Sequence, residues 1–267
     1  MLRTLTERLL AANNARGSAQ TGPSFQIEYL RWFRETSRIL RGRIARKDVD
    51  GLLPTASAWQ VSSITPEPWN RDVLVGLVDT EFSVRIDDLT AAHDALQVEI
   101  ERWDQPGRLL VPDTSLYINH PNKLDDMVLA DDLHERETPL RVIVPIIVID
   151  ELDGLKQSSK NDVRARARQT LAILARVLSN GVGRARLREA DFTPLNNGGI
   201  PRGEVTVEIL FDPPSHQRLP INDDEIIDRA VVMKGLPGRP VTMITYDTGQ
   251  TMRARAACLE VLKLSES

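Results

Sequence analysis

Residues 141–151 read Arg-Val-Ile-Val-Pro-Ile-Ile-Val-Ile-Asp-Glu, a largely β-branched apolar run that ends in two acids. A membrane span needs about 20 apolar residues, and no run in the chain is that long, so we expect no transmembrane segment. The composition of the run is typical of a strand buried on both faces. We therefore expect a strand from Arg141 to Ile149 in a sheet that helices cover.

The chain after Gly107 alternates short apolar runs with amphipathic segments. This alternation predicts an α/β fold, in which parallel strands are joined by right-handed helical crossovers. Further strands are expected at 108–112, 203–211, 240–245 and 259–264, and helices at 162–178, 223–233 and 250–257.

The chain before residue 104 has a helical pattern. Long helices are expected at 25–46, ending before a break at Asp50-Gly51 and Pro54, and from about 72 to 103. In the second helix apolar residues and His93 recur every three or four positions, which predicts a packing seam within the domain or against another subunit. All four tryptophans precede residue 104, and Asp104-Gln-Pro-Gly107 breaks the pattern. We place the domain boundary there, with an all-helical domain at 1–104 and an α/β domain at 105–267.

The composition fits a globular protein, because 41% of the 267 residues are hydrophobic and 27% are charged. A single cysteine, Cys258, excludes a disulfide within the chain, and with no export signal we expect a cytoplasmic location. The histidines are scattered, which argues against a zinc site of Cys and His ligands. The net charge of −4 conceals two basic stripes at 31–47 and 156–188, which could bind a polyanion.

Acidic residues follow or open the predicted elements of the α/β domain. Asp113, Glu151 and Asp247 each follow a predicted strand, and Asp223 and Asp224 open a predicted helix. Ligands of an open parallel sheet bind beyond the carboxyl ends of its strands, so we expect these acids to converge there. Mutual repulsion would oppose that arrangement unless a divalent cation such as Mg²⁺ or Mn²⁺ were shared. Such a site is suited to phosphoryl chemistry.

Other sites of related chemistry do not fit the sequence. Asp113-Thr-Ser115 lacks the second aspartate of a haloacid-dehalogenase site, and Thr248-Gly249 stands where a receiver domain needs a lysine. Neither a GxxxxGK[ST] loop for nucleotide phosphates nor a Gly-x-Ser-x-Gly elbow for a serine hydrolase is present.

Four motifs together resemble those of the PIN-domain nucleases in order and spacing over about residues 108–264. They are Val111-Pro-Asp-Thr-Ser115, Val144-Pro-Ile-Ile-Val-Ile-Asp-Glu-Leu-Asp-Gly-Leu-Lys156, Asn222-Asp-Asp-Glu-Ile-Ile227, and Ile244-Thr-Tyr-Asp247 with Met252-Arg-Ala-Arg-Ala256. The resemblance is to the longer PIN domains of PhoH-like ATPase fusions and RNA-decay factors. It implies a three-layer, Rossmann-like parallel-sheet fold. The segment from about 179 to 221 is longer than the family pattern, and nothing in residues 1–104 resembles a PIN element.

The resemblance implies an Mg²⁺- or Mn²⁺-dependent endoribonuclease that hydrolyses RNA to 5′-phosphate and 3′-hydroxyl products. The catalytic metal-binding acids would be Asp113, Glu151, Asp223 and Asp247, with Asp224 as a further metal ligand. The hydroxyl groups that orient them would be those of Thr114, Ser115 and Thr245. The cations that hold RNA phosphates would be Lys156, Arg253 and Arg255.

Two alternatives stay open at this point. The chain could be a catalytically silent PIN fold that acts as an RNA-binding or protein-interaction module. It could also be a structure-specific DNA nuclease of the related 5′-nuclease group, although the additional acids and the helical arch of that group are not evident. As partners we expect single-stranded RNA, no membrane, and a second copy of the chain bound through the N-terminal helices.

Overall fold

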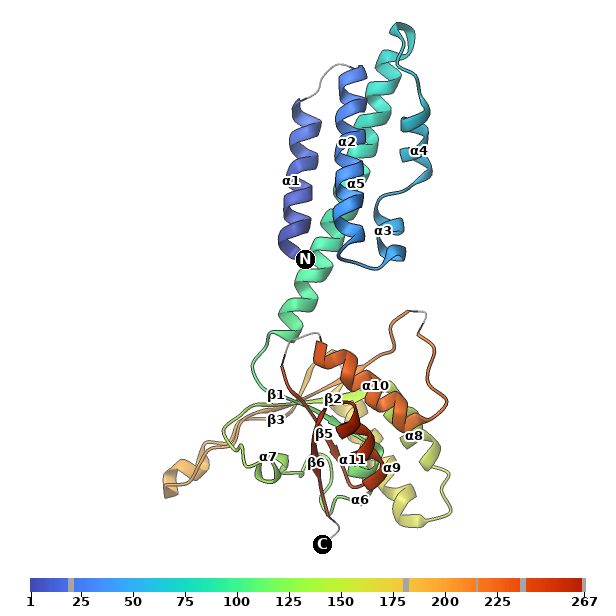
Figure 1. Ribbon diagram of the computed structural model, residues 1–267. Coiled ribbons are helices and arrows are strands. Elements are labelled where there is room, and N and C mark those ends of the chain that lie inside the picture. The colour runs from blue at the N-terminus through green and yellow to red at the C-terminus, as the bar shows by residue number, and fades with distance from the viewer. Residues whose placement is uncertain (19–21, 180–182, 215, 236–238, 266–267) are drawn as a thin grey trace. The chain divides into compact units, whose positions relative to one another are not determined.

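The computed structural model describes residues 1–18, 22–179, 183–214, 216–235 and 239–265 (Figure 1). These residues form two compact units, Met1–Arg102 and Trp103–Ser267. The division lies two residues before the expected boundary after residue 104, because Trp103 packs into the core of the second unit. Within the described ranges, no helix is both long and apolar enough to cross a membrane.

The first unit is helical, as expected. Its elements are α1 (Leu2–Ser18), α2 (Gly22–Arg41), α3 (Arg46–Leu52), α4 (Ala56–Ser63), the 3₁₀ turn η1 (Pro68–Asn70) and α5 (Arg71–Trp103). An aromatic cluster joins α2 to α5, because the ring of Phe82 lies 5.1–5.6 Å from the rings of Phe25, Tyr29 and Trp32. Burial of these rings supplies much of the apolar driving force for the unit.

The predicted helix at 25–46 is wrong at its carboxyl end. The helix α2 ends at Arg41, directly before Gly42, a residue type that destabilises a helix interior. The predicted break at Asp50-Gly51 instead lies inside the short helix α3. Helix α4 was not expected from the sequence, and its amino end is capped by the Thr55 hydroxyl, which accepts a hydrogen bond from the backbone N–H of Ala58.

The second unit contains a six-stranded, mainly parallel sheet with helices packed against it, and this confirms the predicted α/β class. The strands are β1 (Arg108–Pro112), β2 (Leu140–Pro145), β3 (Ala185–Arg188), β4 (Val205–Leu210), β5 (Val241–Thr245) and β6 (Glu260–Lys263). The helices are α6 (Thr114–Asn119), α7 (Leu129–Asp132), α8 (Ile146–Leu155), α9 (Asn161–Val177), α10 (Asn222–Gly235) and α11 (Thr248–Ala256), with the 3₁₀ turn η2 (Thr193–Asn197).

The strand order is β3-β4-β2-β1-β5-β6, and β3 alone among the described strands runs antiparallel to its neighbour. Strand β1 lies between β2 and β5, so the chain builds the sheet first to one side of β1 and later to the other. The carboxyl ends of β1 and β5 therefore flank a topological switch point, where open α/β sheets leave a crevice for ligands.

The predicted strand from Arg141 to Ile149 is too long. Strand β2 ends at Pro145, and residues 146–149 form the first turn of α8. A short apolar run fits a buried strand and a buried helix equally well, and Pro145 marks the change because proline is favoured next to a helix start. Glu151 therefore lies within a helix rather than beyond a strand end.

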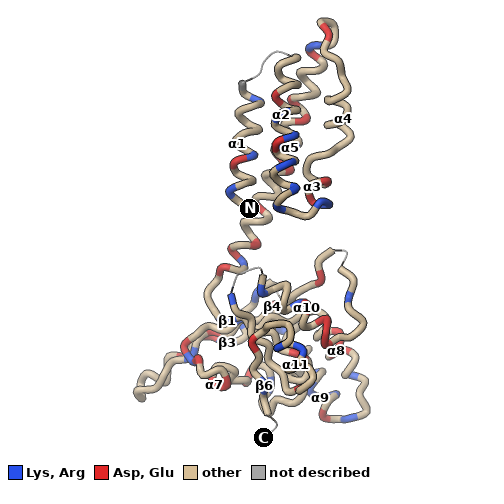
Figure 2. The backbone as a smooth tube through the Cα atoms, viewed as in Figure 1, with Lys and Arg blue, Asp and Glu red and all other residues tan. Residues whose placement is uncertain are grey.

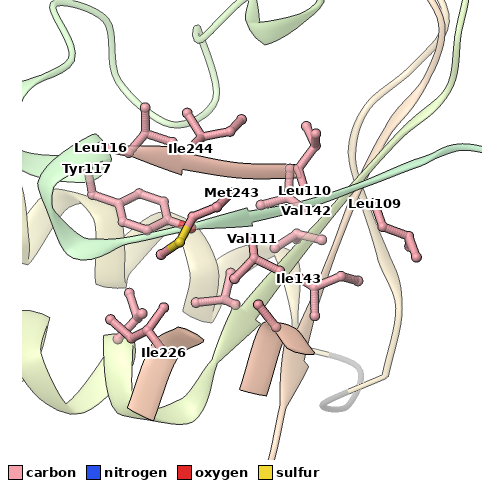
Figure 3. Close-up of a cluster of buried hydrophobic side chains, with 14 of the residues drawn as sticks. Leu109, Leu110, Val111, Leu116, Tyr117, Val142, Ile143, Ile226, Met243 and Ile244 are labelled. Atoms are coloured by element: carbon pink, nitrogen blue, oxygen red, sulfur yellow. The ribbon is translucent and has the colours of Figure 1, made fainter. Parts of the chain in front are cut away.

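Buried side chains of the three central strands and of two helices form the core beside the crevice (Figure 3). The residues that Figure 3 labels are Leu109, Leu110, Val111, Leu116, Tyr117, Val142, Ile143, Ile226, Met243 and Ile244. Strand β1 contributes consecutive buried residues, which is typical of a central parallel strand covered on both faces. This packing holds the carboxyl ends of β1 and β5 at fixed positions.

One ion pair is buried within the sheet. Arg141 of β2 is 1% exposed, and its Nη2 lies 3.2 Å from Oε1 of Glu208 on the neighbouring strand β4. The guanidinium carbon also lies 5.5 Å from the ring centroid of Trp103. Burial lowers the pKa of Arg141, while Glu208 acts against that shift. The carboxylate is thus needed to keep a charged group in the interior.

Replacing Glu208 with Leu should leave the Arg141 guanidinium buried without its carboxylate. We expect the free energy of unfolding to fall by about 3–5 kcal/mol, measured by urea unfolding with circular dichroism. The matched double change, Arg141→Met with Glu208→Leu, removes both charges and should recover most of that loss. A single variant as stable as the parent would show that the pair is not needed.

Candidate active site

The hydroxyl group of Thr245 joins the ends of β1 and β5. It donates a hydrogen bond to Oδ2 of Asp113, the residue after β1, and accepts one of 2.8 Å from the backbone N–H of Asp247, two residues after β5. Thr245 is fully buried, so these bonds are shielded from water. The two acids therefore lie at the same edge of the sheet, as the sequence predicted for strands that run parallel.

Asp113 is held in one orientation. Its Oδ1 accepts hydrogen bonds from the Ser115 hydroxyl at 2.6 Å and from the backbone N–H of Leu116 at 3.2 Å, which makes it the N-cap of α6. Ser115 in turn accepts a bond of 2.9 Å from the backbone N–H of Tyr246. With Thr245 on the other oxygen, both carboxylate oxygens are engaged. Asp113 is only 5% exposed, so this orientation is rigid.

Glu151 reaches the same edge from the second turn of α8. Its Oε2 accepts a hydrogen bond from the Thr114 hydroxyl of α6, and its Oε1 accepts one of 2.9 Å from Nδ2 of Asn222, the first residue of α10. The carboxylate thus ties α8 to two further helices. The helical position corrects the expected one, but it brings Glu151 beside the segments that carry Asp113 and Asp223.

The acids of α10 lie beside α11. Gln250 donates a bond of 2.7 Å from its backbone N–H to Oδ1 of Asp247, and one of 3.2 Å from Nε2 to the carbonyl oxygen of Asp223. Arg253 Nη1 lies 2.9 Å from Oδ1 of Asp224 and 3.9 Å from Oδ2 of Asp223. Asp224 therefore forms a close ion pair with the Arg253 guanidinium group, whereas Asp223 is about 1 Å farther from the same group.

Burial and neighbouring charges raise the pKa values of two of the acids, Asp113 and Asp223. Burial raises the pKa of Asp113 above its ordinary value, hydrogen bonds from Ser115 and Thr245 oppose the shift, and the charge of Asp223 adds to it. Burial also raises the pKa of Asp223, while Arg253 lowers it and the charges of the other acids raise it further. The acids acting on Asp223 are Glu151, Asp247 and Asp224. All five predicted metal ligands are thus coupled at one place.

The carboxylates are close enough to repel one another but are not in a ligating arrangement. Ligands of one ion lie within about 4.8 Å of each other, since metal–oxygen distances are about 2.0–2.4 Å. No three of the five predicted acids, all of which the structure describes, meet that distance. Asp247 is exposed and Asp223 is half-buried, so both border solvent at this edge of the sheet.

A different cluster does meet the distance, and the sequence did not indicate it. Asp212, His216 and Glu225 place one ligand atom each within 4.8 Å of the others. His216 Nε2 lies 2.7 Å from Glu225 Oε1, and each carboxylate also pairs with an arginine, Arg218 with Asp212 and Arg229 with Glu225. Because the carboxylates are already paired, this cluster fixes the segment between β4 and α10, and so the start of α10.

The three predicted substrate-binding cations differ in their surroundings. Arg253 contacts the acids directly, as described above. Lys156, the C-cap of α8, pairs with Asp153 of that helix rather than with a predicted metal ligand. Arg255 is exposed and has no side-chain partner among the described residues. Figure 2 shows the acidic and basic positions of α8, α10 and α11.

Two polar residues at the site were missed as site residues. Asn222 was noted only as part of a motif, and Gln250 only as the start of a predicted helix. Both bond to acids or to their backbone, and Gln250 is fully buried. The only sequence signal was that Asn222 directly precedes Asp223 and that Gln250 follows Asp247 at the capping distance of three residues.

The raised pKa of Asp113 predicts a dependence of stability on pH in metal-free buffer. The folded chain holds a proton on Asp113 that the unfolded chain releases, so stability is lost as pH rises from the ordinary value of 3.8 through the raised one. Asp113→Asn lacks this loss, and its side-chain oxygen can still accept the hydrogen bonds from Ser115 and from the backbone N–H of Leu116. The melting temperature of Asp113→Asn in EDTA should therefore rise relative to that of the parent as the pH increases from 4 to 7.

Asp191→Asn serves as the control, because hydrogen bonds from Thr193 lower the pKa of Asp191. The melting temperature of Asp191→Asn should not rise relative to that of the parent as the pH increases. A melting-temperature difference between Asp113→Asn and the parent that stays constant over this range would contradict the assigned pKa shift.

The sequence that carries these residues matches a known protein family. A comparison with curated proteins found no match. The sequence model of the family described as the PIN domain matches residues 110–265, which is more than half of the chain and includes every acid of the site. Proteins with this domain are usually nucleases and typically use divalent metal ions. The chain belongs to the PIN domain family.

Proposed function

We propose that the chain is an Mg²⁺- or Mn²⁺-dependent endoribonuclease that hydrolyses RNA phosphodiester bonds to 5′-phosphate and 3′-hydroxyl products. The observation that carries the proposal is the hydrogen-bonded network at the ends of β1 and β5. Through Thr245, Thr114, Asn222 and Gln250 it connects Asp113, Glu151, Asp223 and Asp247, which come from four different segments. A structural cap needs one carboxylate, whereas four that repel one another are explained by a shared cation.

The donor atoms fit a hard divalent cation. The site offers carboxylate oxygens, with hydroxyl groups beside them, and no sulfur or imidazole nitrogen contacts the four acids in the described residues. Mg²⁺ and Mn²⁺ prefer such oxygen ligands. The residues that would hold the metal are Asp113, Glu151, Asp223 and Asp247, with Asp224 as a further ligand.

When bound, a divalent cation would lower the pKa of a water molecule and neutralise charge on the phosphodiester. The residues of the chain supply the geometry. Asp113 and Glu151 are each fixed through both carboxylate oxygens, so they present their remaining lone pairs in set directions. Asp223 and Asp247 border solvent, and we propose that the substrate approaches from this side.

Hydrolysis then requires attack by water on the phosphorus in line with the bond to O3′. The P–O3′ bond breaks, the oxygen of water remains on the 5′-phosphate, and a proton goes to the 3′-oxygen. Arg253, which pairs with Asp224, is proposed to bind an RNA phosphate, and Lys156 and Arg255 are proposed to hold flanking phosphates.

Loss of one acid should abolish cleavage. In Mn²⁺ buffer with a 5′-labelled single-stranded RNA, we expect Asp113→Asn and Asp223→Asn to cleave about 100-fold more slowly or worse, because several kcal/mol of charge stabilisation are removed. Asp162→Asn, at an exposed position in the first turn of α9, is the matched control and should cleave like the parent.

The same assay separates the proposed function from its alternatives. Cleavage of the P–O3′ bond leaves a 3′-hydroxyl on the 5′-labelled fragment. Ligation of that fragment at its 3′ end without prior phosphatase treatment would therefore support the proposed products. A parent protein that binds this RNA without cutting it would support the catalytically silent RNA-binding module instead. Cleavage of branched DNA but not of RNA would support the DNA nuclease.

Metal binding should stabilise the folded second unit. At an ion concentration about 100 times the dissociation constant, the gain is about 2.7 kcal/mol, because the ion binds only the folded state. We expect millimolar Mn²⁺ to raise the melting temperature of the parent and of Asp162→Asn, and to have little effect on Asp113→Asn. Equal shifts in all three proteins would place the ion elsewhere.

A further inference from the structure

A groove in the first unit combines cations with an exposed aromatic ring. It has a volume of about 870 Å³ and runs along one face of α2, with Pro54 and Trp59 lining it from the chain that follows. Four arginines of α2 line it, Arg31, Arg34, Arg38 and Arg41, together with Trp59 of α4. Their spacing of three and four residues places them in one row, which rises about 15 Å along the helix.

The row of arginines is not neutralised by the chain itself. In the described residues, the side chains of Arg34, Arg38 and Arg41 have no ion pair, and all three are exposed. Arg31 pairs with Glu28. Glu35 is the one acid that lines the groove. Its Oε1 lies 3.2 Å from Nη1 of Arg8 in α1, so Glu35 pairs with an arginine that does not belong to the row. Figure 2 shows the basic positions that recur along α2.

Trp59 gives the groove an aromatic face. It is 66% exposed, although the two residues that anchor α4, Ala58 and Val61, are buried. The ring therefore contributes little to the core and is open to a ligand in the groove. Exposed Ile27 of α2 and half-buried Pro54 lie in the same groove.

We propose that this groove binds single-stranded RNA. A row of unpaired guanidinium groups tracks a phosphate backbone, and an exposed tryptophan stacks on a base that is not paired. An RNA duplex hides its bases from such a ring, and a lipid surface would need the apolar side chains to protrude rather than to line a groove. The proposal rests on the proposed ribonuclease function for its choice of RNA, and it adds a binding site that contains none of the predicted metal ligands.

The test measures binding without cleavage. Fluorescence anisotropy of a labelled 20-nucleotide oligo(U) is followed with the full chain in EDTA. We expect the triple change Arg34→Ala, Arg38→Ala and Arg41→Ala to weaken binding about tenfold or more, and to reduce the slope of log affinity against log salt by about 2. Trp59→Ala should weaken binding about fivefold or more, whereas Trp59→Phe should retain most of it.

A matched triple change controls for charge alone. Arg3→Ala, Arg46→Ala and Arg71→Ala remove three exposed arginines of the same unit that do not line the groove, and this variant should bind nearly as the parent does. Melting curves of all variants check the fold. Because EDTA removes the metal, a failure of the proposed cleavage leaves this readout unaffected.

Three results would overturn the proposal. The first is an equal loss of affinity in the control triple variant. The second is duplex RNA binding as tightly as oligo(U) and without dependence on Trp59. The third is that phosphatidylserine vesicles or polyglutamate, but not oligo(U), bind in a manner that depends on Arg34, Arg38 and Arg41.

Discussion

Carboxylates that repel one another are held together at one edge of a β-sheet, and the second unit depends on the hydrogen bonds that hold them. Thr245 is central, since its buried hydroxyl group bonds to the acid after β1 and to the backbone of the acid after β5. Burial, together with the charges of neighbouring acids, raises the pKa values of Asp113 and Asp223, and hydrogen bonds from hydroxyl and backbone groups oppose that shift at Asp113. The remaining repulsion is what a divalent cation would relieve.

The sheet creates the place for this site. Because β1 lies between β2 and β5, its carboxyl end adjoins chain segments that lie about 130 residues further along the sequence. The short helices that follow β1 and β2 then bring Thr114 and Glu151 into contact. The apolar core beneath, with consecutive buried residues in β1, keeps these ends from moving apart.

The two units differ in the charged side chains that they expose. The second unit gathers acids at its sheet edge, while the groove of the first unit exposes arginines and a tryptophan. Arginines attract a polyanion and bare carboxylates repel it, so the proposed RNA binding and the proposed hydrolysis would use separate surfaces of one chain. A cation at the acids would lower that repulsion and let an RNA phosphate approach.

Local pattern was enough to predict the α/β class, the helical first unit and the acids at the strand ends, because burial periodicity and strand-end acids are properties of short segments. The PIN domain was indicated by the resemblance of four motifs to that family. Local pattern failed where one segment fits two structures, as at residues 146–149, which are helical rather than extended. It also missed Asn222 and Gln250 as site residues. Only the tertiary structure decided that β1 adjoins β5 and that Asn222 bonds to Glu151, because contacts between residues 71 to 132 positions apart depend on how the whole sheet packs.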